Sequence, residues 1–191
     1  TYTESLFKGA AVPATGPLPS SSDFALDKSV HEFNVEKAKK LLDQAGYKDT
    51  DGDGYREKDG KKVTIDLLSF TRLPEMPLAI EASQQQLKEV GIEAKIRKVE
   101  VSAVATEKNY AFTPYAVVAA PIGDPYAYFN SAVKTGGVGN IGHYSNAEAD
   151  KKIEELATET DQKKRIQLSK EIQALMDKDH GYTIIGFYKV A

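Results

Sequence analysis

The stretch from residue 63 to residue 96 constrains the fold more than any other part of the sequence. Residues 63–67 alternate apolar and polar side chains, as a strand with one buried face does. Residues 79–90 have helical spacing that ends at Gly91, and alternation returns over residues 92–96. Strand, helix and strand in this order predict a βαβ unit with parallel strands and a right-handed crossover. The sequence therefore predicts an α/β fold.

Three more helices are predicted from capping signals. Asn34 can cap a helix with one apolar stripe, and Gly46 stands where its C-cap belongs. Ser145 and Glu148 have capping-box spacing ahead of a second helix, and Asp161 can cap a third.

Two strands and one irregular segment complete the predicted architecture. The apolar run 115–120 fits an interior strand, and residues 182–190 fit a last strand. Residues 1–32 are rich in proline, glycine and serine and have no helical or strand period, so an irregular connecting segment is expected there.

Composition excludes several classes of function. The chain has 25 Lys plus Arg against 28 Asp plus Glu, with no long basic run, so nucleic acid is not an expected partner. There is no cysteine, which excludes disulfides and thiolate metal sites. The longest apolar run, 116–122, is much shorter than the roughly 20 residues of a membrane-spanning helix.

One acidic loop matches part of a calcium-binding motif. Asp49, Asp51, Asp53 and Gly54 occupy positions 1, 3, 5 and 6 of an EF-hand loop. Position 12, which is a bidentate glutamate in that motif, is Gly60 here, and a strand follows instead of a helix. The pattern favours an Asp/Gly-rich turn over a calcium site. No cofactor is expected.

The sequence contains no recognisable catalytic set. There is no Gly-x-Ser-x-Gly elbow, Walker loop or His-Glu-x-x-His motif, and His31, His143 and His180 are far apart. A binding protein is therefore favoured over an enzyme.

The segment 123–125, Gly-Asp-Pro, ends the predicted strand 115–120 at its carboxyl end, where open α/β sheets often bind ligands. Asp124 can pair with an ammonium group, or it can orient the turn by accepting backbone N–H bonds, and the second interpretation is favoured. Nearby aromatic residues can wall a pocket, and some will belong to the core: Tyr115, Tyr126, Tyr128, Phe129 and Tyr144.

Several of these motifs occur in an order known from one protein family. They are residues 33–42, 49–54, 74–77, 84–92, 123–125 and 144–146. In this order and spacing the chain resembles the C-terminal lobe of the family 5 (peptide/nickel-type) extracellular solute-binding proteins of ABC importers.

The resemblance implies a fold, a function and a location. The expected fold is a periplasmic-binding-protein-like (type II) lobe, a mixed sheet flanked by helices, over residues 33–191. Family members have two lobes that close over a solute and deliver it to permease subunits in the membrane. The resemblance also implies a place outside the cytoplasm, in the periplasm or as a lipoprotein at the outer face of the membrane.

The solute stays open between an oligopeptide and a nickel chelate. Peptide-binding relatives often have an aspartate where this chain has Pro121, and dipeptide-type relatives an arginine near the positions of Pro77 and Leu78. The sequence of residues 71–77 is more similar to that of family members that serve nickel uptake. For a nickel chelate, His143 can reach the metal, and Arg72 can bind an acidic chelator.

The predicted ligand-binding residues are therefore Arg72, Pro121, Ile122, Gly123, Asp124, Tyr128, Asn140, His143 and Tyr144. An alternative function is a solute-sensing receptor lobe that signals to a partner protein, with the helices predicted over 147–160 and 161–177 as the docking face.

Overall fold

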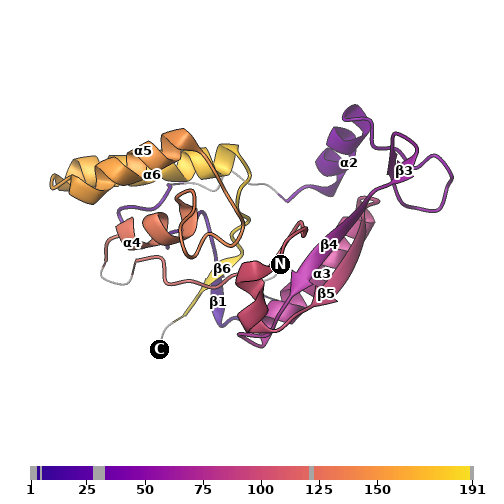
Figure 1. Cartoon of the computed structure of the whole chain (residues 1–191), viewed down its shortest axis with the longest axis horizontal. Coiled ribbons are helices and arrows are strands. Elements are labelled where there is room, and N and C mark those ends of the chain that lie inside the picture. Colours follow the sequence, from indigo (N-terminus) through magenta and orange to yellow (C-terminus); the bar gives the residue numbers. More distant parts are fainter. Residues whose placement is uncertain (1–3, 5, 28–32, 121–122, 190–191) are drawn as a thin grey trace. The chain divides into compact units, whose positions relative to one another are not determined.

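The computed structural model describes residue 4 and residues 6–27, 33–120 and 123–189. The chain divides into two compact units. Unit 1 combines Thr1–His31 with Ala116–Ala191, and unit 2 is the continuous segment Glu32–Tyr115 (Figure 1). Within the described residues, no helix has both the length and the apolar character needed to cross a membrane.

Unit 2 contains the predicted βαβ unit. Strand β4 (Thr64–Ser69) leads into helix α3 (Glu75–Glu89), which returns to strand β5 (Glu93–Lys98). The two strands are parallel and pair along their whole length, which confirms the predicted order and parallel pairing. The right-handed crossover stays a prediction. Helix α3 starts earlier than predicted and includes Pro77 in its first turn, where proline is tolerated because the missing N–H would have no helical partner.

A small core holds α3 against these strands. Leu67 of β4, Ile80 of α3 and Ala94 of β5 are buried together, one from each element. Partly buried residues pack around them: Ile65, Leu87 and Ile96. The apolar residues of the period-2 pattern thus form the face of the strands that α3 covers. This is why the alternation predicted strands with one buried face.

Helix α2 (Val35–Gln44) forms where its capping signals predicted it. The Asn34 side chain accepts a hydrogen bond from the Lys37 N–H at 2.9 Å, and Gly46 follows the helix with φ of +83°. The apolar stripe of α2 is not buried: no residue of the helix is buried, and Leu41 is 56% exposed. Helix α2 therefore contributes no buried residue to a core.

An acidic turn follows α2 and leads into a short hairpin of β2 (Glu57–Lys58) and β3 (Lys61–Lys62). The turn predicted between a helix and a strand is confirmed. Unit 2 also contains a 3₁₀ helix, η1 (Val101–Thr106).

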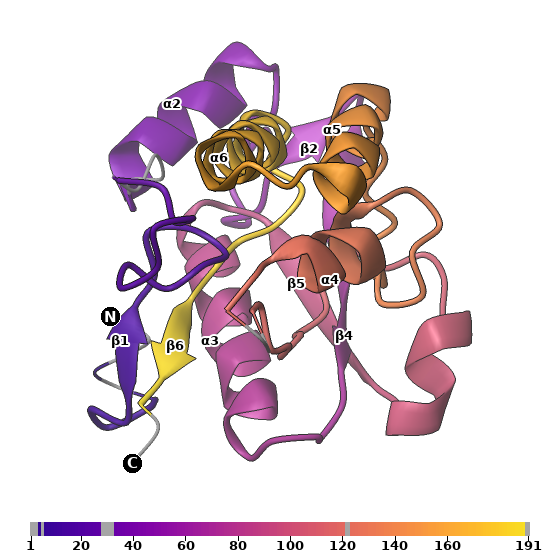
Figure 2. The ribbon, with the colours of Figure 1, turned by 90° about the vertical axis from the view of Figure 1, so that its left-hand side faces the viewer.

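Helices α5 (Ala147–Thr158) and α6 (Gln162–Lys178) dominate unit 1 and lie side by side (Figures 1 and 2). Asp161 caps α6 as predicted, but the cap of α5 is Asn146 rather than Ser145. Asn146 accepts bonds from two backbone N–H groups of the first turn. The fully buried apolar side chains of this unit include Leu18, Phe129, Val133, Ile153, Leu156 and Ile172.

The two ends of the described chain meet in unit 1. Strand β1 (Ala11–Pro13) pairs antiparallel with β6 (Gly186–Tyr188), as Figure 2 shows. The Phe24 carbonyl oxygen accepts bonds from Ser169 Oγ at 3.2 Å and Gln173 Nε2 at 2.7 Å. The mixture of parallel and antiparallel pairs, with helices packed beside them, confirms the predicted α/β class with mixed strand directions. The predicted division into 1–32 and 33–191 stays a prediction.

Two predicted strands need correction. Residues 115–120 form no strand, because the edge of β4 is already occupied by Ala111 and Phe112, which exchange backbone bonds with Asp66 and Leu68. Among the described residues of the predicted span 182–190, the strand covers only Gly186–Tyr188, the three residues that pair with β1.

Candidate functional site

The Gly123–Asp124 turn ends the coil that enters helix α4 (Tyr126–Tyr128) in unit 1. Gly123 has φ of +79°, a conformation that glycine adopts without steric cost. Asp124 Oδ1 accepts a hydrogen bond from the Tyr126 N–H at 2.9 Å. This is the Asx-type turn favoured from the sequence, and it starts the helix.

The second carboxylate oxygen of Asp124 binds an arginine that the sequence reasoning missed. Arg165 of α6 donates to Asp124 Oδ2 from Nε at 2.9 Å and from Nη2 at 2.7 Å. Its Nη1 donates to the carbonyl oxygens of Leu156 at 2.7 Å and Glu159 at 2.6 Å. All three guanidinium nitrogens are therefore engaged. The Asp124 charge is matched within unit 1, which makes the residue a support of the turn.

Asn140 holds the loop between helices η2 (Phe129–Val133) and α5. Its Nδ2 donates to the Lys134 and Tyr144 carbonyl oxygens at 3.0 and 2.7 Å, and its Oδ1 accepts from the Tyr144 N–H at 2.9 Å. The residue is buried. Because a buried amide makes each of these bonds in one orientation only, Asn140 fixes the path of the loop.

Tyr144 is anchored at both ends of its side chain. Its hydroxyl donates to Asp179 Oδ2 at 2.8 Å, and its ring lies 6.1 Å from the ring of Tyr182. Burial, and then the Asp179 carboxylate, raise the pKa of Tyr144 well above its ordinary value. Bonds from Asn146 and Tyr144 lower the pKa of Asp179. The buried Tyr144 hydroxyl is thus a neutral hydrogen-bond donor at physiological pH.

The other predicted residues have different surroundings. Tyr128 is buried and packs against Phe129, whose ring centroid is 5.4 Å away. His143 is exposed with φ of +53°. Arg72 is exposed in unit 2, just before α3. Pro121 and Ile122 lie outside the described residues, and ligand binding by any residue of the set stays a prediction.

The structure therefore brings Gly123, Asp124, Tyr128, Asn140, His143 and Tyr144 together in one unit, as the sequence pattern around residues 123–146 indicated. Of these residues, Tyr128, Asn140 and Tyr144 are buried. Tyr128 packs against Phe129, Asn140 Oδ1 accepts a bond from the Tyr182 hydroxyl, and the Tyr144 hydroxyl donates to Asp179.

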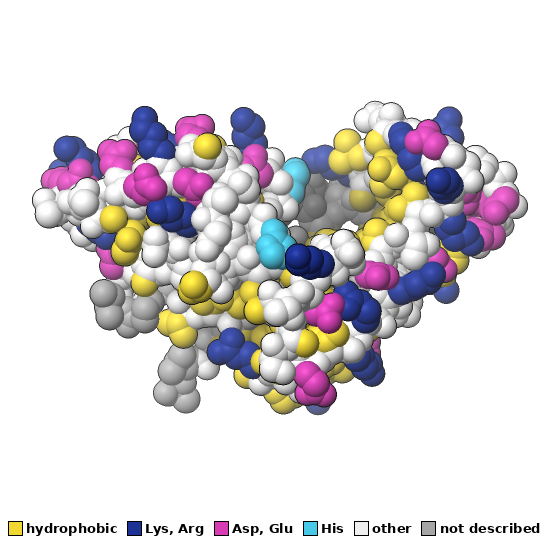
Figure 3. Space-filling model, in the orientation of Figure 1, with side chains coloured by type: hydrophobic (Ala, Val, Ile, Leu, Met, Phe, Trp, Pro, Cys, Tyr) yellow, Lys and Arg dark blue, Asp and Glu magenta, His cyan; other side chains and the backbone are white. Residues whose placement is uncertain are grey.

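The surface of α5 and α6 carries charges of both signs. Figure 3 shows Lys and Arg side chains interspersed with Asp and Glu over these helices. Lys152 pairs with Glu171 at 2.7 Å, and Lys134 pairs with Glu154 at 3.0 Å. The helices predicted as the docking face thus carry at least two ion pairs, and docking of a partner stays a prediction.

Comparison with known proteins gives a consistent picture. Residues 1–140 match the model of the "Bacterial extracellular solute-binding proteins, family 5 Middle". The oligopeptide-binding protein AppA of Bacillus subtilis is 34% identical over 179 residues, which are 90% of this chain and 32% of that protein. The nickel-binding protein NikA of Staphylococcus aureus is 28% identical over 184 residues, which are 95% of this chain and 35% of that protein.

The structural comparison agrees. The crystal structure of a nickel ABC transporter protein from Bacillus halodurans has a TM-score of 0.86 and 26% identity, covering 97% of this chain and 39% of that one. The chain spans about a third of the length of the curated relatives described above. The motif order, the α/β fold and the match over residues 1–140 agree, and the chain belongs to the family 5 bacterial extracellular solute-binding proteins.

Proposed function

We propose that this chain is the C-terminal lobe of the substrate-binding component of an ABC importer. In this proposal a second lobe closes with it over a solute, which is then delivered to permease subunits in the membrane. The observation that carries the proposal is the family match over residues 1–140, with relatives named as binding proteins. The same family membership supports a location outside the cytoplasm and a role without catalysis.

An oligopeptide is the solute we favour. Among the relatives described above, the highest identity, 34%, is to an oligopeptide-binding protein. The carboxylate of Asp124 is held by Arg165, so a peptide amino terminus would find no unmatched charge at that residue. We infer that this chain recognises peptide backbone and shape rather than a terminal ammonium group at Asp124.

A nickel chelate is the second candidate, and one observation favours it. The Bacillus halodurans neighbour and the Staphylococcus aureus relative are both named for nickel. In this chain His143 is exposed on the loop that Asn140 holds, and imidazole is a suitable ligand for Ni²⁺.

Within unit 1 we propose two kinds of contribution. Asp124, Asn140 and Tyr144 give the loops a fixed shape through the bonds described above. Gly123 and His143 stand on those loops and present groups that a solute can contact. Fixed loops reduce the entropy lost on binding, so this arrangement favours affinity.

Calorimetric titration of the full-length protein that contains this chain tests the function. The titrants are a mixture of oligopeptides and, separately, Ni²⁺ with L-histidine. Heat with peptides supports peptide uptake, and heat only with nickel and histidine assigns the protein to metal uptake. If neither titration releases or absorbs heat of binding, the proposal is contradicted.

Two histidine variants separate the candidates further. His143→Asn keeps a residue that tolerates positive φ and removes the imidazole. His180→Asn is the matched control, because His180 is also exposed and has φ of +52°. If a nickel chelate is the solute and His143 contacts it, His143→Asn weakens nickel binding at least about tenfold and His180→Asn leaves it unchanged.

A further inference from the structure

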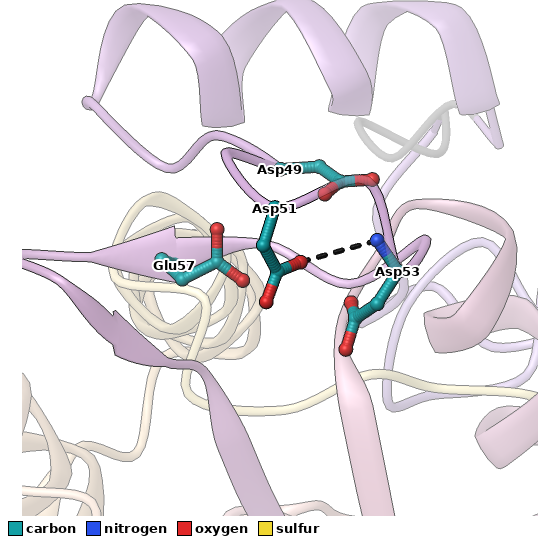
Figure 4. Close-up of side chains that lie close together, drawn as sticks. All are labelled: Asp49, Asp51, Asp53 and Glu57. Atoms are coloured by element: carbon teal, nitrogen blue, oxygen red, sulfur yellow. Dashed lines mark hydrogen bonds between the residues drawn. The ribbon is translucent and has the colours of Figure 1, made fainter.

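Four carboxylates gather in the turn between α2 and β2 in unit 2. They belong to Asp49, Asp51, Asp53 and Glu57, and one oxygen of each lies within 4.8 Å of the others. Figure 4 shows the aspartates on the loop and Glu57 on the strand that follows it. The solute-binding proposal makes no use of this cluster.

Backbone N–H groups set the direction of the three aspartates. Asp49 accepts from Gly52 at 2.7 Å and from Gly54 at 3.0 Å, one bond on each carboxylate oxygen. Asp51 accepts from the Asp53 N–H at 3.1 Å (Figure 4), and Asp53 accepts from the Tyr55 N–H at 2.9 Å. These bonds account for the shape of the turn, and they alone do not call for a ligand.

Glu57 supplies the observation that points to a cation. Its side chain is on β2 and the residue is only 8% exposed. Its Oε2 accepts from the Thr50 N–H at 2.7 Å and from Thr50 Oγ1 at 2.6 Å. Its Oε1 is buried and has no hydrogen-bond partner among the described residues. A buried carboxylate oxygen without a partner is costly, and such atoms in native proteins call for an explanation such as a bound ion.

The donor set indicates the kind of ion. Carboxylate oxygens are hard ligands, and the cluster offers no imidazole or thiolate, so zinc, copper and nickel are disfavoured. Ca²⁺ takes six to eight oxygens at flexible angles, whereas Mg²⁺ demands near-octahedral geometry and keeps much of its water. A loop with three exposed aspartates and one buried glutamate fits Ca²⁺, because water can complete the open side.

We propose that this loop binds Ca²⁺ through Asp49, Asp51, Asp53 and Glu57. The missing acidic residue at EF-hand position 12, which argued against calcium in the sequence, is compensated by Glu57 at position 9. Lys62 pairs with Asp53, so the ion competes with this ammonium group for one carboxylate. A bound ion joins the loop after α2 to the β2–β3 hairpin.

The affinity of the 191-residue chain tests the proposal. The chain is freed of divalent ions with EDTA, dialysed, and titrated with CaCl₂ and separately with MgCl₂ in a calorimeter. We expect a Kd for Ca²⁺ of about 10⁻³ M or tighter, as for extracellular calcium modules, and weaker binding of Mg²⁺. Tb³⁺ luminescence sensitised by Tyr55, which directly follows Gly54, gives a second readout at the loop itself.

Variants decide whether the ion sits in this loop. Glu57→Gln keeps an acceptor for Thr50 and removes the charge, and we expect it to weaken Ca²⁺ binding at least about tenfold. Asp51→Asn, at an exposed position where folding is not at risk, should weaken binding to a similar degree.

Asp59→Asn is the matched control. Asp59 lies in the same hairpin, outside the cluster, and asparagine tolerates its φ of +52°. Binding that falls in Glu57→Gln and Asp51→Asn but not in Asp59→Asn supports the proposal. Equal binding by all four proteins, or no calcium-dependent heat and no sensitised Tb³⁺ emission from the unsubstituted chain, overturns it.

Discussion

Replacing Arg165 with methionine should destabilise unit 1 by about 3 kcal/mol. The substitution removes two bonds to the Asp124 carboxylate and two to carbonyl oxygens. All four bonds are donated by the guanidinium cation, and hydrogen bonds to charged groups contribute about 1.5–3 kcal/mol each. The expected loss is smaller than the sum of these bond energies, because the Asp124 side chain is 25% exposed and water can solvate its carboxylate after the substitution.

A double-mutant cycle with Asp124→Asn isolates the pair. Asparagine can still accept the Tyr126 N–H bond, so the turn is kept while the charge is removed. We expect a coupling energy between the two substitutions of about 1–2 kcal/mol, within the range found for residues in direct contact. Lys163→Met is the control, since Lys163 is an exposed residue of α6 and loses the same charge.

Urea unfolding followed by circular dichroism measures these free energies, because α5 and α6 contribute much of the helix signal. Lys163→Met should stay within about 0.5 kcal/mol of the unsubstituted chain. A coupling energy below about 0.5 kcal/mol would refute the structural role of the pair. Solute affinity lost in Asp124→Asn with stability unchanged would then assign Asp124 to the ligand.

Three further predictions concern stability. Asp179 has a pKa below its ordinary value of 3.8, so its stabilising contribution is present above that pH and is lost as the pH falls through the lowered pKa. In Asp179→Asn, Tm should therefore fall less steeply as the pH is lowered. An unchanged fall of Tm at acid pH would contradict the stabilising role of the Asp179 carboxylate. Gly181→Ala places a Cβ 2.5 Å from Tyr144 Cδ2 and should lower stability by about 1–3 kcal/mol in urea unfolding, whereas an unchanged midpoint would show that the ring can move away. Leu67→Ala should lower it by about 2–5 kcal/mol, because Leu67 is fully buried in the core of unit 2, and a loss below 1 kcal/mol would mean that this core is not packed as described.

The βαβ unit was predictable because its signals are local. Residues 63–67 and 92–96 repeat every two positions, and the helix between them ends at a glycine with φ of +81°. The capping signals of α2 and α6 are local in the same sense. The strand predicted over 115–120 is wrong because an apolar run does not reveal whether a neighbouring strand has an unpaired edge. Here Phe112 already pairs with Leu67 at the edge of β4.

The contacts of the candidate site could not be read from the sequence. Asp124 and Arg165 are 41 residues apart, and nothing near either residue indicates the other. The burial of Glu57 was equally hidden, because it depends on Thr50 and on the fold of the hairpin. The Gly-Asp-Pro turn, by contrast, was predictable because Asx turns are built from neighbouring residues.

The pairing of β1 with β6 has a consequence for how the chain folds. The two strands are separated by most of the described sequence, and the bonds from α6 to Phe24 span 145 and 149 residues. Unit 2 needs only the continuous segment Glu32–Tyr115. During synthesis, or after dilution from denaturant, unit 2 has its contacts within reach early, whereas unit 1 must close a long loop first. Folding in two kinetic phases, with the slower one reporting unit 1, follows from this chain order.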